Sequence, residues 1–337
     1  GQNAVTGLRG QNAVTGLRGP NAGTGLRGPN AGTGLRGQNA GTGLRGQNAV
    51  TALLEPRLLA RLEALQLATR RRLAGRFAGE HVSTRRGSSP DFADYRQYHP
   101  GDDFRRIDYF LYARLDVLVI KLFEAEEDLH LRLLVDTSAS MAGDGKLDAA
   151  RRVAAALGFV ALTRRDTVSV HTFGERRTQA RRFVGRGGAP ALFDHLAALE
   201  AGGATPFAAA ASHLLGRPGP AGLTVVISDL LTPEWEAAIT RLPARGADVV
   251  VVHVLAPDEL RPALEGDLEL VDRETGHRLA VSLAPETLRR YQRSVDDWLA
   301  RITARCRQVG ATYLRLLTTD DFEAALLGGW QRAGLLR

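Results

Sequence analysis

Blocks of apolar and polar residues follow one another along this chain and predict strands and helices in turn. Short, mostly apolar runs predict strands at 117–123, 129–135, 167–173, 178–184, 223–228, 248–255 and 313–317. The run 129–135 has little charge and no clean alternation, as expected of a strand buried on both faces. Apolar residues repeated every three or four positions predict helices at 147–160, 190–199, 206–215, 235–242 and 285–309. Strands alternating with helices indicate an α/β fold, a doubly wound and mainly parallel sheet of the Rossmann type.

Residues 52–128 have a different pattern and predict an appended α+β segment before this domain, which we assign to 129–337. Leu58, Leu62, Leu65 and Leu73 predict an amphipathic helix. A dense polar segment at 91–109 follows, with a Pro-Gly turn at 100–101, after which Asp102 or Asp103 is expected to cap a helix. Within the larger domain, 268–271 and 277–281 are expected to form a hairpin.

The first 54 residues are six copies of a nine-residue unit, of which the sixth decays near residue 51. Each of the first five units offers one leucine and two or three glycines, which is too little apolar surface to offset the entropy of ordering the chain. We therefore expect 1–51 to be a disordered low-complexity tail.

The net charge of +7 is concentrated in that tail, whose five arginines have no acidic counterpart; the rest holds 39 basic and 37 acidic residues. This balance does not call for nucleic acid. The basic cluster Arg70, Arg71, Arg72, Arg76, Arg85 and Arg86 keeps nucleic-acid binding open as an alternative, but a solvated helix end is favoured.

The single cysteine, Cys306, fits a reducing compartment, and no apolar run reaches the roughly 18 residues of a membrane span. We expect a cytoplasmic protein without membrane insertion.

Candidate chemistry begins where the apolar run 131–135 ends in Asp136, followed at spacings of two by Ser138 and Ser140. Ligands of open α/β sheets bind at the carboxyl ends of strands, and Mg²⁺ prefers oxygen donors. A second apolar run ends in Asp229, and a glycine loop between the two runs presents Thr205 just before a helix. These five residues are our candidate Mg²⁺ ligands, and Mn²⁺ is expected to substitute.

Asp-x-Ser-x-Ser, then Thr, then Asp is the order of a metal-ion-dependent adhesion site (MIDAS), so the chain resembles a von Willebrand factor A domain. That resemblance implies that Ser138, Ser140 and sometimes Thr205 touch the ion, while Asp136 and Asp229 hold its waters. The open position then takes an acidic residue of a partner protein.

With the polar segment included, the chain resembles the bacterial DUF58 family from about residue 53 to its end. Tyr109 stands where the family usually has Trp. The resemblance implies a MoxR-type AAA+ ATPase as partner, with this protein as its adaptor in assembly, maturation or metal insertion for a third protein. The matching residues are Phe92, Asp94, Arg96, Tyr98, Pro100, Gly101, Asp102, Asp103, Arg105, Ile107 and Asp108, the run 120–124, and the hairpin 270–276.

We therefore expect a non-enzymatic protein-interaction module with no catalytic residues. The enzymatic alternative is a Mg²⁺-dependent phosphatase or phosphotransferase with Asp136 as nucleophile. In this alternative the chain would be similar to haloacid-dehalogenase hydrolases, which need a second Asp two residues later for proton transfer, and Ser138 stands there. The alternating Asp and Arg of the polar segment favour an ion-pair and turn network over catalysis. The eight histidines lack zinc-ligand spacing.

Overall fold

A computed structural model describes residues 53–69, 92–123, 129–174, 180–204, 206–216, 222–244, 246–262, 266–271 and 277–337. The expected tail at 1–51, the basic cluster at 70–86 and the candidate ligand Thr205 lie outside these ranges. The chain divides into two compact units, one formed by Gly1–Leu67 with His130–Arg337 and the other by Ala68–Leu129. Each unit is described by itself.

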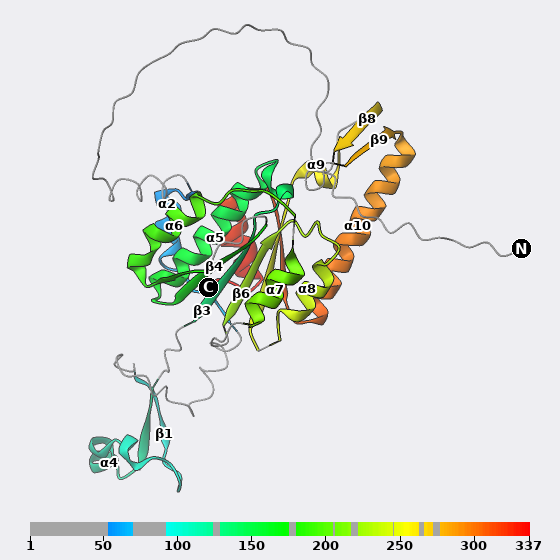
Figure 1. Ribbon diagram of the computed structural model, residues 1–337. Helices are drawn as coiled ribbons and strands as arrows, with labels where there is room; N and C mark the ends of the chain where they lie inside the picture. Colours follow the sequence, from blue (N-terminus) through cyan, green and yellow to red (C-terminus); the bar gives the residue numbers. More distant parts are fainter. Residues whose placement is uncertain are drawn as a thin grey trace, which may run out of the picture. The chain divides into compact units, whose positions relative to one another are not determined.

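The larger unit is built on one six-stranded sheet with the order β10-β7-β6-β3-β4-β5 (Figure 1). Neighbouring strands are parallel except for β5, which runs antiparallel to β4 at the edge. The expected mixed α/β fold with a mainly parallel, Rossmann-like sheet is confirmed. The strands are β3 (His130–Asp136), β4 (Thr167–Phe173), β5 (Arg181–Val184), β6 (Leu223–Ser228), β7 (Asp248–Leu255) and β10 (Thr312–Leu317).

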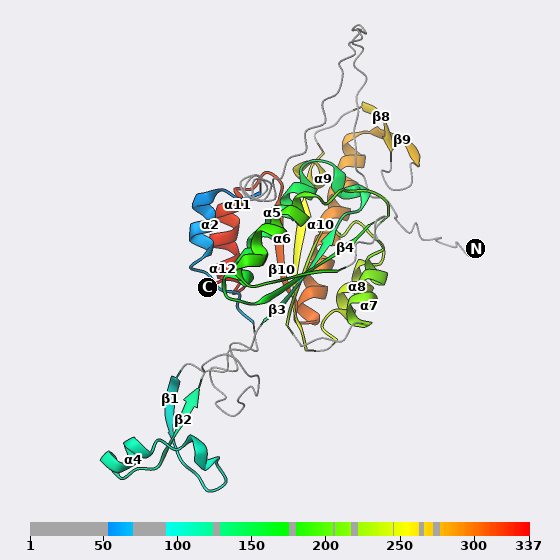
Figure 2. The same ribbon diagram turned by 60° about the vertical axis from the view of Figure 1, so that its left-hand side comes forward.

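Helices cover both faces of this sheet (Figure 2). Successive strand residues point to opposite faces. Leu133 accordingly packs near Gly158 on one helical layer, while Leu134 lies in the core with Phe207 and Ile302 on the other. The first layer holds α2 (Pro56–Leu62), α5 (Lys146–Thr163) and α6 (Ala189–Ala197), and the second α7 (Phe207–Gly216), α8 (Trp235–Arg241) and α10 (Pro285–Gln308).

Shorter elements complete the larger unit. The expected hairpin is present, since β8 and β9 pair in antiparallel fashion. The chain closes with short helical turns after β10 rather than with one continuous helix. These elements are η2 (Ala139–Ala142), η3 (Arg186–Gly188), α9 (Pro257–Leu260), β8 (Gly266–Val271), β9 (Arg278–Leu283), α11 (Phe322–Ala324), the π turn η4 (Ala325–Gly329) and α12 (Trp330–Arg332).

The first predicted helix is shorter than its leucine spacing suggests. Helix α2 ends at Leu62, so Leu65 lies beyond it, and Leu73 is outside the described residues. The cause is long-range pairing: Gln66 exchanges two backbone hydrogen bonds with Arg337, at 2.9 and 3.2 Å, which requires extended backbone. As a result α2 belongs to the larger unit, and the predicted domain boundary at 52 moves to 67/68.

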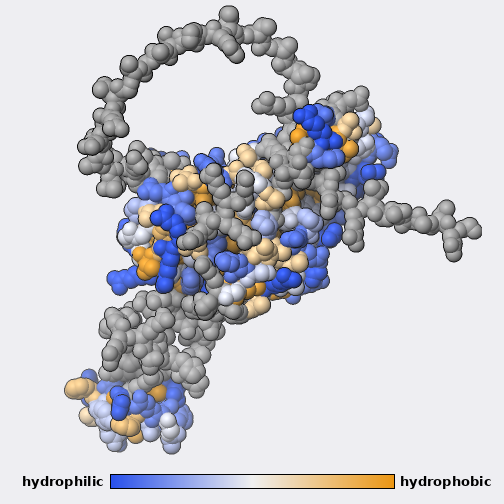
Figure 3. Space-filling view, viewed as in Figure 1, coloured by the Kyte–Doolittle hydropathy of each residue, from blue (hydrophilic) through white to orange (hydrophobic). Residues whose placement is uncertain are grey.

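The described residues of the smaller unit form an antiparallel strand pair and two short helices, η1 (Phe104–Arg106) and α4 (Tyr109–Leu115). The predicted strand at 117–123 begins two residues later, as β2 (Val119–Phe123), and pairs with β1 (Phe92–Gln97). Strand β1 lies in the polar segment, where no strand was predicted. Helix α4 has no buried residue, and apolar surface is visible on this unit in Figure 3.

Candidate metal centre

The candidate site lies at the carboxyl ends of two neighbouring strands. Parallel pairing places Val135 of β3 opposite Ile227 of β6, so Asp136 and Ser228 follow at the same level of the sheet. Asp229 is the next residue after β6. Both aspartates are fully buried. The topology agrees with the expectation that each aspartate stands at the end of a strand, and it places the two strands side by side.

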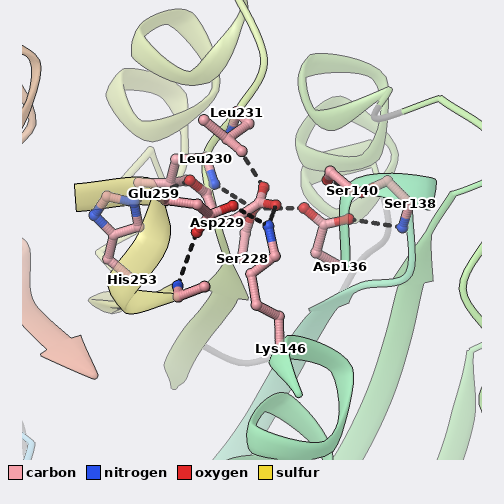
Figure 4. A network of polar contacts seen from close by, with 11 residues as sticks. Asp136, Ser138, Ser140, Lys146, Ser228, Asp229, Leu230, Leu231, His253 and Glu259 are labelled. Carbon is pink, nitrogen blue, oxygen red and sulfur yellow. Dashed lines mark hydrogen bonds and ion pairs between the residues drawn. The ribbon is translucent and has the colours of Figure 1, made fainter. Parts of the chain in front are cut away.

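Hydrogen bonds fix the carboxylate of Asp136 on both oxygens (Figure 4). Its Oδ1 accepts the Ser138 backbone N–H at 2.9 Å, which closes a tight turn directly after the strand. Its Oδ2 accepts the Ser228 hydroxyl from the neighbouring strand at 2.5 Å. Each carboxylate oxygen has a second lone pair, so both can still bind a cation or a water.

The two serines of the candidate site face each other. The hydroxyls of Ser138 and Ser140 form a hydrogen bond with their oxygens 2.9 Å apart, and both side chains are fully buried. Neighbouring ligands of an octahedral Mg²⁺, each about 2.0–2.1 Å from the ion, lie about 2.9 Å from one another. The spacing of the serine oxygens fits two adjacent ligand positions.

Backbone contacts from two other segments hold the loop after β3. Thr137 accepts the Gly202 N–H at 2.8 Å, and Ala139 donates its N–H to the Gly203 carbonyl at 2.8 Å. Gly203 has a φ of 73°, a conformation that favours glycine. The glycine loop that leads towards Thr205 is therefore joined to the serine loop, although Thr205 itself is outside the described residues.

Asp229 is held as firmly as Asp136. Its Oδ1 accepts the Leu231 backbone N–H at 3.1 Å, and its Oδ2 accepts the ammonium group of Lys146 at 2.7 Å. Between them, Leu230 has a φ of 54°, which is strained for a residue with a branched side chain. Such strain persists only where surrounding contacts enforce it, and it is concentrated at functional sites.

Lys146 is the main participant that the sequence patterns did not reveal. It is fully buried at the start of α5 and donates to both Asp229 and Glu259, at 2.7 and 2.5 Å. Glu259 on α9 also accepts the Ala256 N–H at 2.8 Å. One signal was available: the chain has only two lysines among its 44 basic residues.

The electrostatics follow from this burial. Burial, followed by the charge of Asp229, raises the pKa of Asp136 to about 7. Burial also raises the pKa of Glu259. Burial alone would lower the pKa of Lys146, but the charges of Asp229 and Glu259 outweigh it, so the net shift is upward. Lys146 therefore stays positively charged next to Asp229. The charges of Asp136 and Asp229 together favour a cation at the site.

His253 is fully buried and neutral, and it connects the backbone of Asp229 to Tyr313. Its ring nitrogens lie 2.9 Å from the Asp229 carbonyl oxygen and 2.9 Å from the Tyr313 hydroxyl, and burial lowers its pKa to about 4.

Across the described ranges, no three His, Cys, Asp or Glu side chains are grouped as metal ligands. A metal at this site would therefore depend on the serine hydroxyls as well as on carboxylates.

The polar segment of the smaller unit forms local turns and caps. Arg96 donates to Asp102 at 2.9 Å, and Asp102 also accepts the His99 N–H at 2.8 Å. Asp103 caps η1, and Asp108 caps α4. These contacts are of the structural kind that the sequence favoured for this segment.

Three curated relatives are similar to most of this chain. They are uncharacterized proteins, one of Mycobacterium bovis and two of Mycobacterium tuberculosis strains. Each is 29% identical over 284 residues, which cover 81% of this chain and 89% of the relative. Among the described helices, none combines the length and hydrophobicity needed to cross a bilayer.

Two solved structures are similar to parts of the chain, each with a TM-score of 0.36 over 61% of this chain and 98% of the other. One is the conserved hypothetical protein BatB of Bacteroides thetaiotaomicron, at 14% identity. The other is an aerotolerance-related membrane protein of Bacteroides fragilis, at 19% identity. The model of the DUF58 family, described as a protein of unknown function, matches residues 94–299, more than half of the chain. This protein therefore belongs to the DUF58 family.

Proposed function

We propose that this protein is a non-enzymatic, Mg²⁺-dependent protein-interaction module of the von Willebrand factor A type. The observation that carries the proposal is the 2.9 Å spacing of the Ser138 and Ser140 hydroxyls next to two buried aspartates. Hydroxyls supply ligand oxygens without charge. A cation held largely by hydroxyls and water stays electron-poor, and an incoming carboxylate gains strongly by binding it.

The proposed partner is a protein that offers an acidic residue to this cation. The family resemblance implies a MoxR-type AAA+ ATPase, with the present protein as its adaptor for the assembly or maturation of a third protein. The proposal also includes a cytoplasmic location, where the buried thiol of Cys306 would stay reduced.

Metal binding is tested by titrating Mn²⁺ into the full-length protein and following free Mn²⁺ by electron paramagnetic resonance. Asp136→Asn removes one charge from the site, and we expect affinity to fall at least tenfold. Asp144→Asn is the matched control, because Asp144 is an exposed aspartate of the same loop and asparagine tolerates its φ of 58°. Equal binding by Asp136→Asn and the parent would rule out the site.

Partner binding is tested with the purified MoxR-type ATPase of the same organism on a biosensor surface. Binding should be lost in EDTA, return with Mg²⁺, and be lost in Ser138→Ala, which removes a hydroxyl without changing charge. The Asp144→Asn variant should bind like the parent. Binding that persists in EDTA would contradict the adhesion mechanism even if the metal site exists.

A further inference from the structure

Lys146 forms an ion pair with Asp229, one of the two aspartates of the proposed metal site. Its ammonium nitrogen lies 2.7 Å from Asp229 Oδ2, while Asp229 Oδ1 already accepts the Leu231 N–H. An ammonium with three donors at this distance forms a charge-assisted hydrogen bond, which is stronger than a neutral one. Each oxygen of Asp229 keeps a second lone pair, as in Asp136, but the positive charge of Lys146 next to Oδ2 opposes direct binding of a cation there.

Glu259 holds Lys146 in this position. It accepts from the ammonium at 2.5 Å and from the Ala256 N–H at 2.8 Å, and the Tyr291 hydroxyl donates to its backbone carbonyl at 2.6 Å. Lys146 thus lies between two anchored carboxylates, one directly after β6 and one on α9. A buried ion pair with both partners in place resists displacement, since removing one partner leaves the other buried and unpaired.

We propose that Lys146 is a positioning residue that keeps Asp229 from ligating the metal directly and thereby keeps the ion receptive to a partner carboxylate. This inference rests on the proposed metal site. With Asp229 restricted to water-mediated contact, the ion receives less negative charge from this protein. Affinity for the metal alone is lowered, and affinity of the metal-loaded site for an external carboxylate is raised.

A variant that conserves the net charge of the site separates the effect of the position of Lys146 from the effect of its charge. Asp136, Asp229 and Glu259 with Lys146 carry a net charge of −2, and the double variant Lys146→Met/Glu259→Gln carries the same −2 on the two aspartates. The double variant frees Asp229 Oδ2 without altering this sum. The double variant leaves Asp229 buried without its counter-charge, which costs stability in the metal-free protein and increases the gain from a bound Mn²⁺.

The experiment titrates Mn²⁺ into the full-length parent and the double variant and counts Mn²⁺-bound waters by water-proton relaxation. We expect the double variant to bind Mn²⁺ at least tenfold more tightly and to hold one water fewer, because Asp229 replaces it. Arg305→Met/Glu236→Gln is the matched control, since it removes an ion pair between α10 and α8 and also conserves net charge.

Three outcomes are distinguishable. A parent that binds no Mn²⁺ overturns the proposed function, and with it this inference. Equal affinity and equal hydration in the parent and double variant overturn the inference alone. Weaker binding by the double variant also overturns it, because Lys146 would then orient Asp229 towards the ion. The single variant Lys146→Met, at a charge of −3, gives an independent measure of the charge effect.

Discussion

Ser228 stands one residue before Asp229, yet its hydroxyl donates a hydrogen bond to the other aspartate, Asp136. The pairing of β3 with β6 brings it to Asp136 Oδ2, and the same hydroxyl oxygen accepts the Leu230 N–H at 2.9 Å. It therefore links both strand ends and supports the strained backbone at Leu230. The geometry of the site therefore depends on short hydrogen bonds between neighbouring strand ends. The residues packed around these strand ends leave little space for an added side chain.

Gly174, directly after β4, offers a test of that tight packing. A Cβ there would lie 2.6 Å from Thr137 Oγ1 and 2.7 Å from the Thr137 carbonyl oxygen, so Gly174→Ala must displace the serine loop. We expect a loss of about 1–3 kcal/mol in the free energy of unfolding and weaker Mn²⁺ binding. Gly187→Ala, where the new Cβ has no atom within 4 Å, is the control for urea denaturation. Equal stability of the two variants would contradict this account.

Helix α4 of the smaller unit depends on its N-terminal cap more than on packing. Helix α4 buries no side chain, and Phe110 on it is 86% exposed. A helix of this length is marginal by itself, because few hydrogen bonds repay the cost of its first turn. Its N-cap Asp108 accepts the N–H groups of Phe110 and Leu111 at 3.0 and 3.1 Å, and the Tyr95 hydroxyl at 3.0 Å.

The cap at Asp108 should therefore control whether α4 forms. Asp108→Ala should cost about 1 kcal/mol and speed amide hydrogen exchange at Phe110 and Leu111, measured by NMR. Asp108→Asn should restore most of the protection, because asparagine caps helices about as well as aspartate. Equal protection in the alanine variant and the parent would show that α4 is held by something other than its cap.

At the scale of the whole molecule, the half-buried His130 links stability to pH. Burial, with the charges of Arg132 and Arg182, lowers the pKa of His130 from 6.5 to about 4. Between these values the unfolded chain binds a proton that the folded protein does not. The stability that His130 contributes is therefore complete above pH 6.5 and is lost as the pH falls towards 4.

Urea denaturation at pH 7.5 and pH 5.0 checks this expectation. The parent should lose more stability between the two pH values than His130→Gln, in which the titrating group is absent. His213→Gln, on an exposed residue of α7, is the control and should behave like the parent. If the pH dependence of His130→Gln matches that of the parent, the pKa of His130 is not lowered in the folded protein.

The sequence by itself predicted the α/β class, most strand and helix positions of the larger unit, and four described candidate ligands. These depend on local properties: apolar periodicity marks buried elements, and polar residues directly after apolar runs mark strand ends. Asp136, Ser138 and Ser140 lie within five residues of one another, so the loop that joins them is visible in the chain.

Tertiary structure alone decided what surrounds those ligands. Lys146 meets Asp229 across 83 residues and Glu259 across 113, and Ser228 reaches Asp136 across 92. The early end of α2 and the pairing of β1 with β2 were likewise set by distant segments. No periodicity records such contacts, because they depend on strand order. The folded sheet brings together α5, the end of β6 and α9, which carry the lysine and the two carboxylates. Only this arrangement decides that Lys146 is buried between carboxylates and not solvated.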